Sequence, residues 1–286
     1  MKKVLVTGAT GFVGNYVVKK LLEENYEVTA TSLNETKAKN AEWFKHVTYI
    51  PFNLNELCKE KNYYSFFKQP DLLIHLAWEG LPNYKSDFHI KINLPNHCNF
   101  LENLISNGLS DISVTGTCLE YGLLQGCLNE KLFVSPSNPY GIAKYKLYEF
   151  LAGLQKNYSF NLKWIRLFYI YGEGQNPNSL FSQLDRALAN KEKIFNMSGG
   201  EQVRDYLPVL KVAEYILKIA VQKKVTGIIN CCSGKPVKLK DFAEGYLRQK
   251  NERIQFNLGY YSYTDYEPMR FWGDDTKLKT ILDDNE

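Results

Sequence analysis

Long apolar runs are missing from this 286-residue sequence. No stretch approaches the roughly 20 apolar residues that a membrane-spanning helix needs, so no membrane partner is expected. The apolar run near the N-terminus is short and is interrupted by three glycines and two threonines, which argues against a secretory signal peptide. The sequence therefore predicts a cytoplasmic protein.

A strong charge of one sign and metal-type cysteine spacing are also lacking. The formal net charge is only +4, and no lysine- or arginine-rich run alternates with the aromatic residues, so no nucleic-acid partner is expected. The six cysteines show no metal spacing, and no metal is expected. Cys231 and Cys232 fall in a strand-like segment, where neighbours face opposite ways, and buried thiols are favoured over disulfides.

The first fourteen residues carry the clearest local pattern. Lys3 to Val6 reads as a buried strand, and after Gly14 the apolar residues change to helical spacing. Gly8, Gly11 and Gly14 lie three residues apart, which permits a sharp turn and a close approach of the backbone to a phosphate. The N–H groups at the start of the helix favour an anion. A phosphate cradle is predicted, and a glycine turn needed for geometry alone is the plainer alternative.

Strand and helix patterns alternate over most of the chain, without internal repeats or low-complexity linkers. They predict an α/β fold, a Rossmann-type doubly wound parallel sheet with a smaller C-terminal substrate-binding lobe. The expected strands span residues 3–6, 27–31, 47–51, 72–76, 111–115, 162–167 and 227–231, and the clearest helices span 94–106 and 140–155. We expect residues 1–167 and about 207–233 to form the dinucleotide-binding domain, and about 168–206 and 234–286 to form the lobe.

The end of the second expected strand bears on the type of dinucleotide. Folds that bind NAD place a carboxylate there, which accepts hydrogen bonds from the adenosine ribose and repels a 2′-phosphate. Ser32 occupies this position, the first carboxylate is Glu35, and Lys37 and Lys39 follow. NADP(H) is therefore favoured, and NAD(H) remains the alternative because no arginine is present to bind the phosphate.

Tyr140 and Lys144 are a candidate acid–base pair. Asn138 and Pro139 predict the start of a helix, and a spacing of four places Tyr140 and Lys144 on one of its faces. We expect the ammonium group to lower the pKa of the phenol and to bind a ribose hydroxyl. The tyrosine would then exchange a proton with a carbonyl or alcohol oxygen, as hydride transfer requires. An exposed pair on an amphipathic helix is the alternative.

Three motifs together resemble the extended short-chain dehydrogenases, the NAD-dependent epimerase/dehydratase family that acts on nucleotide sugars. They are the glycine turn, the Tyr140–Lys144 pair and the run Thr117-Cys118-Leu119-Glu120-Tyr121-Gly122. Matches at Asn93, at the Arg166–Gly172 run, at Arg204-Asp205-Tyr206 and at Arg270 extend the resemblance over nearly the whole chain. It implies a catalytic set of Thr117, Tyr140 and Lys144, with Thr115 in place of Thr117 if the register slips by two.

The residue order and the resemblance also predict the binding residues. The expected cofactor contacts are Gly8, Thr10, Gly11, Phe12, Val13, Gly14, Ser32, Asn53, Leu54, Leu76, Ala77, Trp78, Asn93, Thr115, Tyr140 and Lys144. The expected substrate contacts are Thr117, Cys118, Tyr140, Tyr169, Asn178, Arg204 and Arg270. Two arginines suit a pyrophosphate, although each alone could form a surface ion pair. Tyr169 replaces the family's usual Asn, and Cys118 is expected to be a packed thiol rather than an acid.

The residues after Thr117 restrict which reactions of the family are expected. Family dehydratases and decarboxylases carry a Glu two positions on, where this chain has Leu119, and Glu120 in a strand-like segment should face the other way. A 4-ketoreductase or a 4-epimerase remains. The absence of an acid at Ser32 and the compact lobe favour NAD(P)H-dependent reduction of a nucleotide-linked 4-keto-6-deoxy sugar for surface polysaccharide.

The resemblance implies a dTDP- or CDP-linked substrate and a homodimer as the default assembly. A 4-epimerase that retains NAD is the second interpretation. A non-catalytic NADP-binding sensor or scaffold is the third, although such relatives tend to lose the tyrosine or the lysine, and both are present here.

Overall fold

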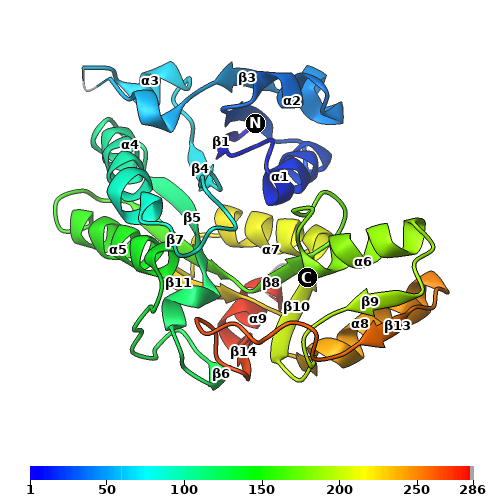
Figure 1. The fold of residues 1–286 in the computed structure, drawn as a ribbon. Coiled ribbons are helices and arrows are strands. Elements are labelled where there is room, and N and C mark those ends of the chain that lie inside the picture. Colours follow the sequence, from blue (N-terminus) through cyan, green and yellow to red (C-terminus); the bar gives the residue numbers. More distant parts are fainter. Residues whose placement is uncertain (59, 284–286) are drawn as a thin grey trace.

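The computed structural model describes residues 1–58 and 60–283, and within them seven parallel strands form a central sheet in the order β11-β7-β5-β4-β1-β2-β3 (Figure 1). The strands are β1 (Lys3–Thr7), β2 (Glu27–Ser32), β3 (Thr48–Pro51), β4 (Leu72–His75), β5 (Asp111–Thr117), β7 (Asn161–Leu167) and β11 (Gly227–Cys231). Each lies within two residues of its predicted bounds, so the predicted doubly wound sheet is confirmed. β11 returns late in the chain to form one edge.

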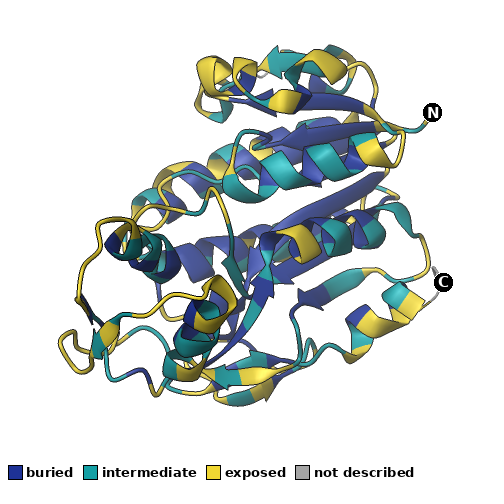
Figure 2. Cartoon of the chain, turned by 90° about the vertical axis from the view of Figure 1, so that its right-hand side faces the viewer, coloured by how far each residue is buried: buried dark blue, intermediate teal, exposed yellow. Residues whose placement is uncertain are grey.

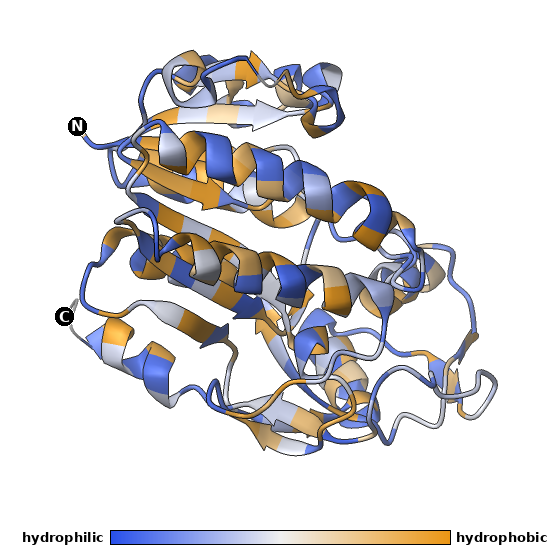
Figure 3. Ribbon diagram, turned by 90° about the vertical axis from the view of Figure 1, so that its left-hand side faces the viewer, coloured by the Kyte–Doolittle hydropathy of each residue, from blue (hydrophilic) through white to orange (hydrophobic). Residues whose placement is uncertain are grey.

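Helices cover both faces of this sheet, which explains why most residues of β1, β2, β4, β5 and β7 are buried. On one face α1 (Phe12–Glu23), α7 (Val209–Val221) and α9 (Thr276–Asp283) pack with Val4 and Val6 in one buried cluster. On the other face α3 (Tyr63–Phe66), α4 (Leu94–Ser106) and α5 (Pro139–Leu154) pack with Leu5 in a second cluster. The buried strands lie between helices whose outer faces are exposed and polar (Figures 2 and 3).

The C-terminal part contains more strands than its sequence pattern suggests. A three-stranded sheet joins β8 (Tyr169–Tyr171), β10 (Val203–Pro208) and β12 (Pro236–Lys238). Two further pairs join β9 (Ile194–Asn196) to β13 (Gln255–Asn257), and β6 (Gly126–Leu128) to β14 (Phe271–Gly273). Most of these strands have three residues, too few to show a period of two. The helices α6 (Leu180–Ala189) and α8 (Leu239–Lys250) accompany them, and α2 (Glu35–Lys39) follows β2.

Three further features are seen in residues 1–58 and 60–283, which the structure describes. All strands of the central sheet run the same way, so the carboxyl ends of β1, β2, β4, β5 and β7 meet at one edge. No helix in this part of the chain combines the length and the apolar character needed to cross a bilayer. All six cysteines are free thiols; Cys118, Cys231 and Cys232 are buried, whereas Cys58 and Cys127 are exposed.

Candidate active site at the carboxyl edge of the sheet

The glycine turn after β1 adopts a shape that only glycine allows at two positions. Gly8 has φ +69°, and a Cβ there would lie 2.7 Å from the backbone nitrogen of Ala77. A Cβ on Gly14 would collide with the carbonyl oxygen of Gly8. Gly11 begins α1 without a side-chain cap, so the first N–H groups of the helix remain available to a phosphate.

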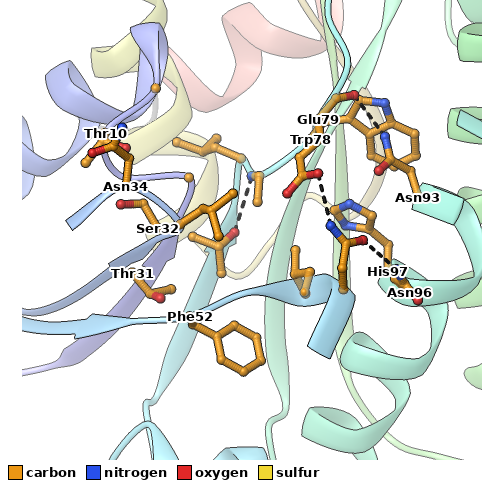
Figure 4. Close-up of a pocket in the computed structure, with 18 residues that line it drawn as sticks. Thr10, Thr31, Ser32, Asn34, Phe52, Trp78, Glu79, Asn93, Asn96 and His97 are labelled. Atoms are coloured by element: carbon orange, nitrogen blue, oxygen red, sulfur yellow. Dashed lines mark hydrogen bonds between the residues drawn. The ribbon is translucent and has the colours of Figure 1, made fainter. Parts of the chain in front are cut away.

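A cavity of about 230 Å³ opens beside this turn (Figure 4). The predicted cofactor residues that line it are Gly8, Thr10, Gly11, Ser32, Leu54, Leu76, Ala77, Trp78 and Asn93. They come from the β1–α1 turn, the ends of β2 and β4, the turn after β3 and the start of α4. In Figure 4, Trp78 and Asn93 lie with His97 and Asn96 of α4 on one side of the opening, and Thr10 and Ser32 lie on the other. The shape and the donors suit the adenosine and phosphate part of a dinucleotide.

Asn53, a predicted cofactor residue, does not line this cavity. Its side chain accepts a hydrogen bond from Asn55 N at 3.0 Å and donates one to Glu56 at 2.7 Å, because it caps the short turn Leu54–Glu56. Asn55 lines the cavity instead. An Asn directly before a turn signals a cap in the sequence, and this signal competes with the predicted contact to adenine.

A second cavity of about 410 Å³ continues from the first, because Gly8, Gly11, Leu76 and Trp78 line both. The other predicted site residues that line it are Phe12, Val13, Gly14, Thr115, Thr117, Cys118, Tyr140, Lys144 and Tyr169. The structure therefore places all three predicted catalytic residues beside the glycine turn. Lobe residues such as Tyr169 and Glu267 line the same space.

The start of α5 brings Tyr140 to the end of β5. Asn138 caps the helix by accepting a hydrogen bond from Gly141 N at 2.9 Å, as its sequence position predicted. A Cβ on Gly141 would lie 2.7 Å from the carbonyl oxygen of Leu119, so this glycine lets the helix approach the turn that follows Thr117. One turn further along α5, Lys144 Nζ donates a hydrogen bond to the carbonyl oxygen of Thr115 at 2.9 Å.

Burial has the largest effect on the pKa values of both Tyr140 and Lys144, contrary to the expectation that Lys144 lowers the pKa of Tyr140. Burial raises the pKa of the Tyr140 phenol, Tyr84, Glu120 and Cys118 raise it further, and Thr117 opposes the shift. Burial lowers the pKa of Lys144 to about 7. The ammonium group lies 4.0 Å from the centre of the Trp78 ring and donates a hydrogen bond to the carbonyl oxygen of Thr115. Tyr140 is thus a protonated acid in this site.

Both ring nitrogens of His75 have hydrogen-bond partners inside the protein. Its Nδ1 lies 2.8 Å from Thr7 Oγ1, and its Nε2 lies 2.7 Å from His97 Nδ1. Burial lowers the pKa of His75 to about 3, so the ring is neutral. His75 lines neither cavity and has no direct access to a substrate.

The two predicted arginines do not form a joint pyrophosphate site. Arg204 is buried and already bonds Tyr169 Oη at 3.1 Å, the carbonyl oxygen of Met269 at 3.2 Å and Glu267 at 3.0 Å. Arg270 forms an isolated parallel β-bridge with Val203, next to Arg204. It is exposed and lines neither cavity.

Asn178 is also exposed and outside both cavities, whereas Gln175 and Asn176 line the second one. The loop that carries all three has no periodic pattern, so the sequence could not indicate which side chains turn inward.

Three residues of the site were not predicted from the sequence. Tyr84 accepts a hydrogen bond from Tyr140 N through its carbonyl at 3.1 Å, and the two rings lie 5.5 Å apart. Glu267 brings a carboxylate from the lobe to the cavity wall. Glu120 was expected to face away in a strand; instead Cys118–Tyr121 forms a tight 3₁₀ turn that folds Glu120 back beneath Thr117. A Thr followed three residues later by Glu is the signature of a capping box and could have revealed this turn.

The part of the chain that the structure describes contains no group of three or more His, Cys, Asp or Glu side chains arranged to hold a metal. The polar groups around the two cavities are mainly hydroxyls, backbone N–H groups, side-chain amides and Lys144, which suit the phosphates and hydroxyls of an organic cofactor and substrate.

Residues 4–232 match the family model described as the NAD dependent epimerase/dehydratase family. The chain is 30% identical over 271 residues to the dTDP-6-deoxy-L-talose 4-dehydrogenase (NAD(+)) of Aggregatibacter actinomycetemcomitans, which covers 94% of this chain and 98% of that protein. It is 25% identical over 237 residues to the GDP-6-deoxy-D-talose 4-dehydrogenase of the same organism, covering 81% and 74% of the two chains. The solved structure of the UDP-glucuronic acid 4-epimerase from Bacillus cereus, in complex with UDP-glucuronic acid and NAD, shares the fold, with a TM-score of 0.84 at 22% identity over 98% of this chain and 93% of that one.

Proposed function

The chain belongs to the NAD dependent epimerase/dehydratase family of extended short-chain dehydrogenases, and from this premise we propose that it catalyses hydride transfer at C4 of a nucleotide-linked 6-deoxy sugar. In the direction we favour, NAD(P)H reduces the C4 ketone to an alcohol. The observation that carries the proposal is the convergence of Thr117, Tyr140 and Lys144 on a cavity that continues into the glycine cradle.

The names of two relatives support the position on the sugar. Both are 4-dehydrogenases of 6-deoxytaloses, one linked to dTDP and the other to GDP. Oxidation of a C4 alcohol and reduction of the C4 ketone are the two directions of one reaction. We therefore propose a dTDP-linked substrate first. The CDP-linked alternative, and a role in supplying activated sugars for surface polysaccharide, are proposed from the sequence resemblance.

The residues present fit a dinucleotide. The backbone of the Gly8–Gly14 turn and the uncapped start of α1 would hold its phosphates, and a side chain at Gly8 or Gly14 would clash with the neighbouring backbone and distort this turn. Lys144 would exchange its contact with Thr115 for a ribose hydroxyl. When bound, the dinucleotide supplies or accepts the hydride.

Two side chains that line the second cavity, Tyr140 and Thr117, can donate hydrogen bonds to the oxygen at C4. Tyr140, which burial keeps protonated, donates its phenolic proton to the carbonyl oxygen as negative charge develops there. The Thr117 hydroxyl accepts a hydrogen bond from Leu119 N at 3.3 Å, which leaves its own hydrogen to donate to the same oxygen. The negative charge that develops on this oxygen is thus stabilised by two hydrogen-bond donors.

For the dinucleotide we propose that NADP(H) is accepted as well as NAD(H). No carboxylate stands at the end of β2 to repel a 2′-phosphate, since Ser32 lines the cavity there. The lysines that follow offer little attraction, because Lys39 is paired with Glu35 at 2.9 Å. The relative that shares 30% identity is named for NAD(+), and this similarity favours NAD(H). The missing carboxylate at the end of β2 favours NADP(H).

A 4-epimerase with retained NAD is the second candidate. The Bacillus cereus protein, solved with a nucleotide sugar and NAD, is named for that activity and shares the whole fold. Epimerisation would use the same tyrosine to take the proton from the C4 hydroxyl and later return it to that oxygen, while the hydrogen on C4 passes to the dinucleotide as hydride and comes back on the other face. A reductase consumes reduced dinucleotide and an epimerase causes no net change in it, which decides the experiment.

The test is a panel of dTDP-, CDP-, UDP- and GDP-linked 4-keto-6-deoxyhexoses, with NADPH or NADH followed at 340 nm. The proposal expects steady consumption of reduced dinucleotide with at least one of them. The Tyr140→Phe variant should retain dinucleotide binding and lose about a thousandfold in kcat, since the general acid is removed. The corresponding 4-hydroxy sugar nucleotides with NAD⁺ test the second candidate, and inversion at C4 seen by NMR without net change at 340 nm would establish the epimerase. A folded protein that binds dinucleotide and turns over neither the 4-keto nor the 4-hydroxy sugars would contradict both.

A further inference from the structure

A buried carboxylate lies directly beneath the predicted catalytic threonine. Glu120 has no exposed surface, and three groups donate hydrogen bonds to it. They are Thr117 N at 2.8 Å, Trp164 Nε1 at 3.0 and 3.1 Å, and Arg166 Nε at 2.7 Å. The carboxylate therefore ties the end of β5 to two side chains of the neighbouring strand β7.

The chain is built closely around this contact. A Cβ on Gly116 would collide with both the Trp164 ring nitrogen and Glu120 Oε1, so the backbone passes against the carboxylate without a side chain between them. Arg166, paired with Glu120, also lies with its guanidinium carbon 4.4 Å from the centre of the Tyr121 ring. Both sides of the Thr117 turn are thereby fixed to β7.

The turn itself directs the Thr117 hydroxyl. Thr117 and Glu120 form a capping box, in which the hydroxyl accepts from Leu119 N while the carboxylate accepts from Thr117 N. A hydroxyl whose acceptor site is engaged in this way presents its hydrogen elsewhere. Thr117 lines the second cavity with Tyr140, so that direction is toward the substrate space.

We infer that Glu120 is a positioning residue for Thr117: anchored by Arg166 and Trp164, its carboxylate holds the Thr117 main chain so that the hydroxyl donates to the oxygen at C4. This inference rests on the proposed function for the identity of that oxygen. A carboxylate that only balanced Arg166 within the core would have no need to accept from the main chain of Thr117.

The charge of Glu120 also reaches the acid–base pair. It raises the pKa of Tyr140 and, against the larger effect of burial, raises that of Lys144. Removing the charge should therefore lower both pKa values and move the pH–rate profile to lower pH. Because this electrostatic effect does not require Thr117, the dependence of the rate on Thr117 is the separate test of positioning.

The experiment compares Glu120→Gln with Glu130→Gln in wild-type and Thr117→Ala backgrounds. Glu130 is a matched control because its carboxylate also accepts a backbone N–H, that of Asn230 at 2.9 Å, and it lines neither cavity. Gln at 120 has one acceptor oxygen where three donors converge, so one donor loses its partner. Thermal melting first establishes that each variant is folded, and Glu120→Asp, which keeps the charge on a shorter chain, is the substitute if Glu120→Gln is not.

We expect Glu120→Gln to lower kcat about tenfold to a hundredfold, with the KM for dinucleotide within about threefold, because the effect passes through Thr117. In the Thr117→Ala background the same change should cost less than about threefold, and Glu130→Gln should stay within about twofold of wild type. An equal loss in both backgrounds, or full activity in Glu120→Gln, would overturn the inference.

A second measurement keeps the inference separate from the proposed function. If no nucleotide sugar in the panel is turned over, hydrogen exchange of the free protein still reports the hold on Thr117. Glu120→Gln should then speed amide exchange at Thr117 by about tenfold while Ile112 to Val114 in the same strand stay protected. Unchanged exchange at Thr117 would overturn the inference whatever the substrate is.

Discussion

The cofactor side and the substrate side of the cavity are built in different ways. On the cofactor side, Gly8 and Gly14 shape the backbone, and main-chain groups at the end of regular strands and the start of α1 form the cradle. On the substrate side, Tyr84 and Glu267 stand on loops that line the second cavity, and each is held by a side chain: Arg204 pairs with Glu267 at 3.0 Å, and the Tyr84 ring packs against that of Tyr140. The first surface is fixed by chain geometry and the second by individual side-chain contacts.

This difference predicts how each side tolerates change. A backbone cradle fails when any atom is added to it, but many sequences around it serve equally well. A side-chain surface can lose one contact and keep the rest, so its substitutions should alter affinity and selectivity by smaller factors. Lys144 lies where the two sides meet, since it contacts Trp78, which lines both cavities.

The largest effect is expected at Lys144, where function and stability oppose each other. Lys144→Met should lower kcat about a thousandfold, because the acid–base pair loses its cation. The same variant should melt at a higher temperature than wild type at pH 7. The pKa of Lys144 falls from its ordinary 10.5 to about 7 on folding, so the unfolded chain binds more protons between these values and burial of the lysine costs stability there.

The lowered pKa of Lys144 determines how the difference in stability between Lys144→Met and wild type changes with pH. Wild-type stability attributable to Lys144 should rise as the pH increases from about 7 toward 10.5, as the proton ceases to favour the unfolded chain. The melting advantage of Lys144→Met should therefore shrink over this range. Denaturant melts of both proteins at pH 7, 8.5 and 10 measure it, and an advantage that grew with pH would contradict the burial of an uncompensated lysine.

The next effect is expected at the cradle. Gly14→Ala places a methyl group against the carbonyl oxygen of Gly8, so the turn must open and the Kd for NADH should rise at least about a hundredfold. Fluorescence titration with NADH measures this. Gly153→Ala is the matched control, because a Cβ there meets nothing within 4 Å, and it should bind NADH normally and gain about 0.5–1 kcal/mol of stability.

How well the sequence predicted each side follows the same division. Seven strands, the Tyr140 helix with its Asn138 cap and the glycine turn were predictable, because apolar period, capping residues and glycine spacing are local properties. The position of Asn178 in its loop and the partner of Arg204 depend on contacts between segments far apart in the chain, such as Arg204 with Glu267. Local pattern carries no information about such pairs.

Two arginines of the lobe give a sharper test of the side-chain surface. Arg204→Gln leaves Glu267 without its ion pair at the cavity wall and should raise the KM for nucleotide sugar at least about tenfold. Arg270→Gln changes an exposed side chain outside both cavities and should stay within about twofold. Steady-state kinetics of both variants with the same substrate decide the matter. An equal rise in KM would show that the two guanidiniums do act together on the pyrophosphate.

The smallest effect is expected at Ser32, where the cofactor side depends on a side chain rather than on the backbone. Its hydroxyl lies 3.0 Å from Tyr49 Oη at the end of β2, in the wall of the first cavity. Ser32→Asp would add a carboxylate that accepts from the adenosine ribose hydroxyls and repels a 2′-phosphate. The ratio of NADH affinity to NADPH affinity should then rise about tenfold, while Ser32→Ala, which adds no charge, should leave it within about twofold.

Thermal melts with NADPH, NADP⁺, NADH and NAD⁺ at equal concentration measure this ratio, because a ligand at 100 times its Kd adds about 2.7 kcal/mol of stability. In wild type the same melts rank the two dinucleotides. If Ser32→Asp left the ranking unchanged, the adenosine ribose could not lie at the end of β2. The first cavity would then hold another part of the ligand, and the cofactor side would owe its selectivity to residues elsewhere along the sheet edge.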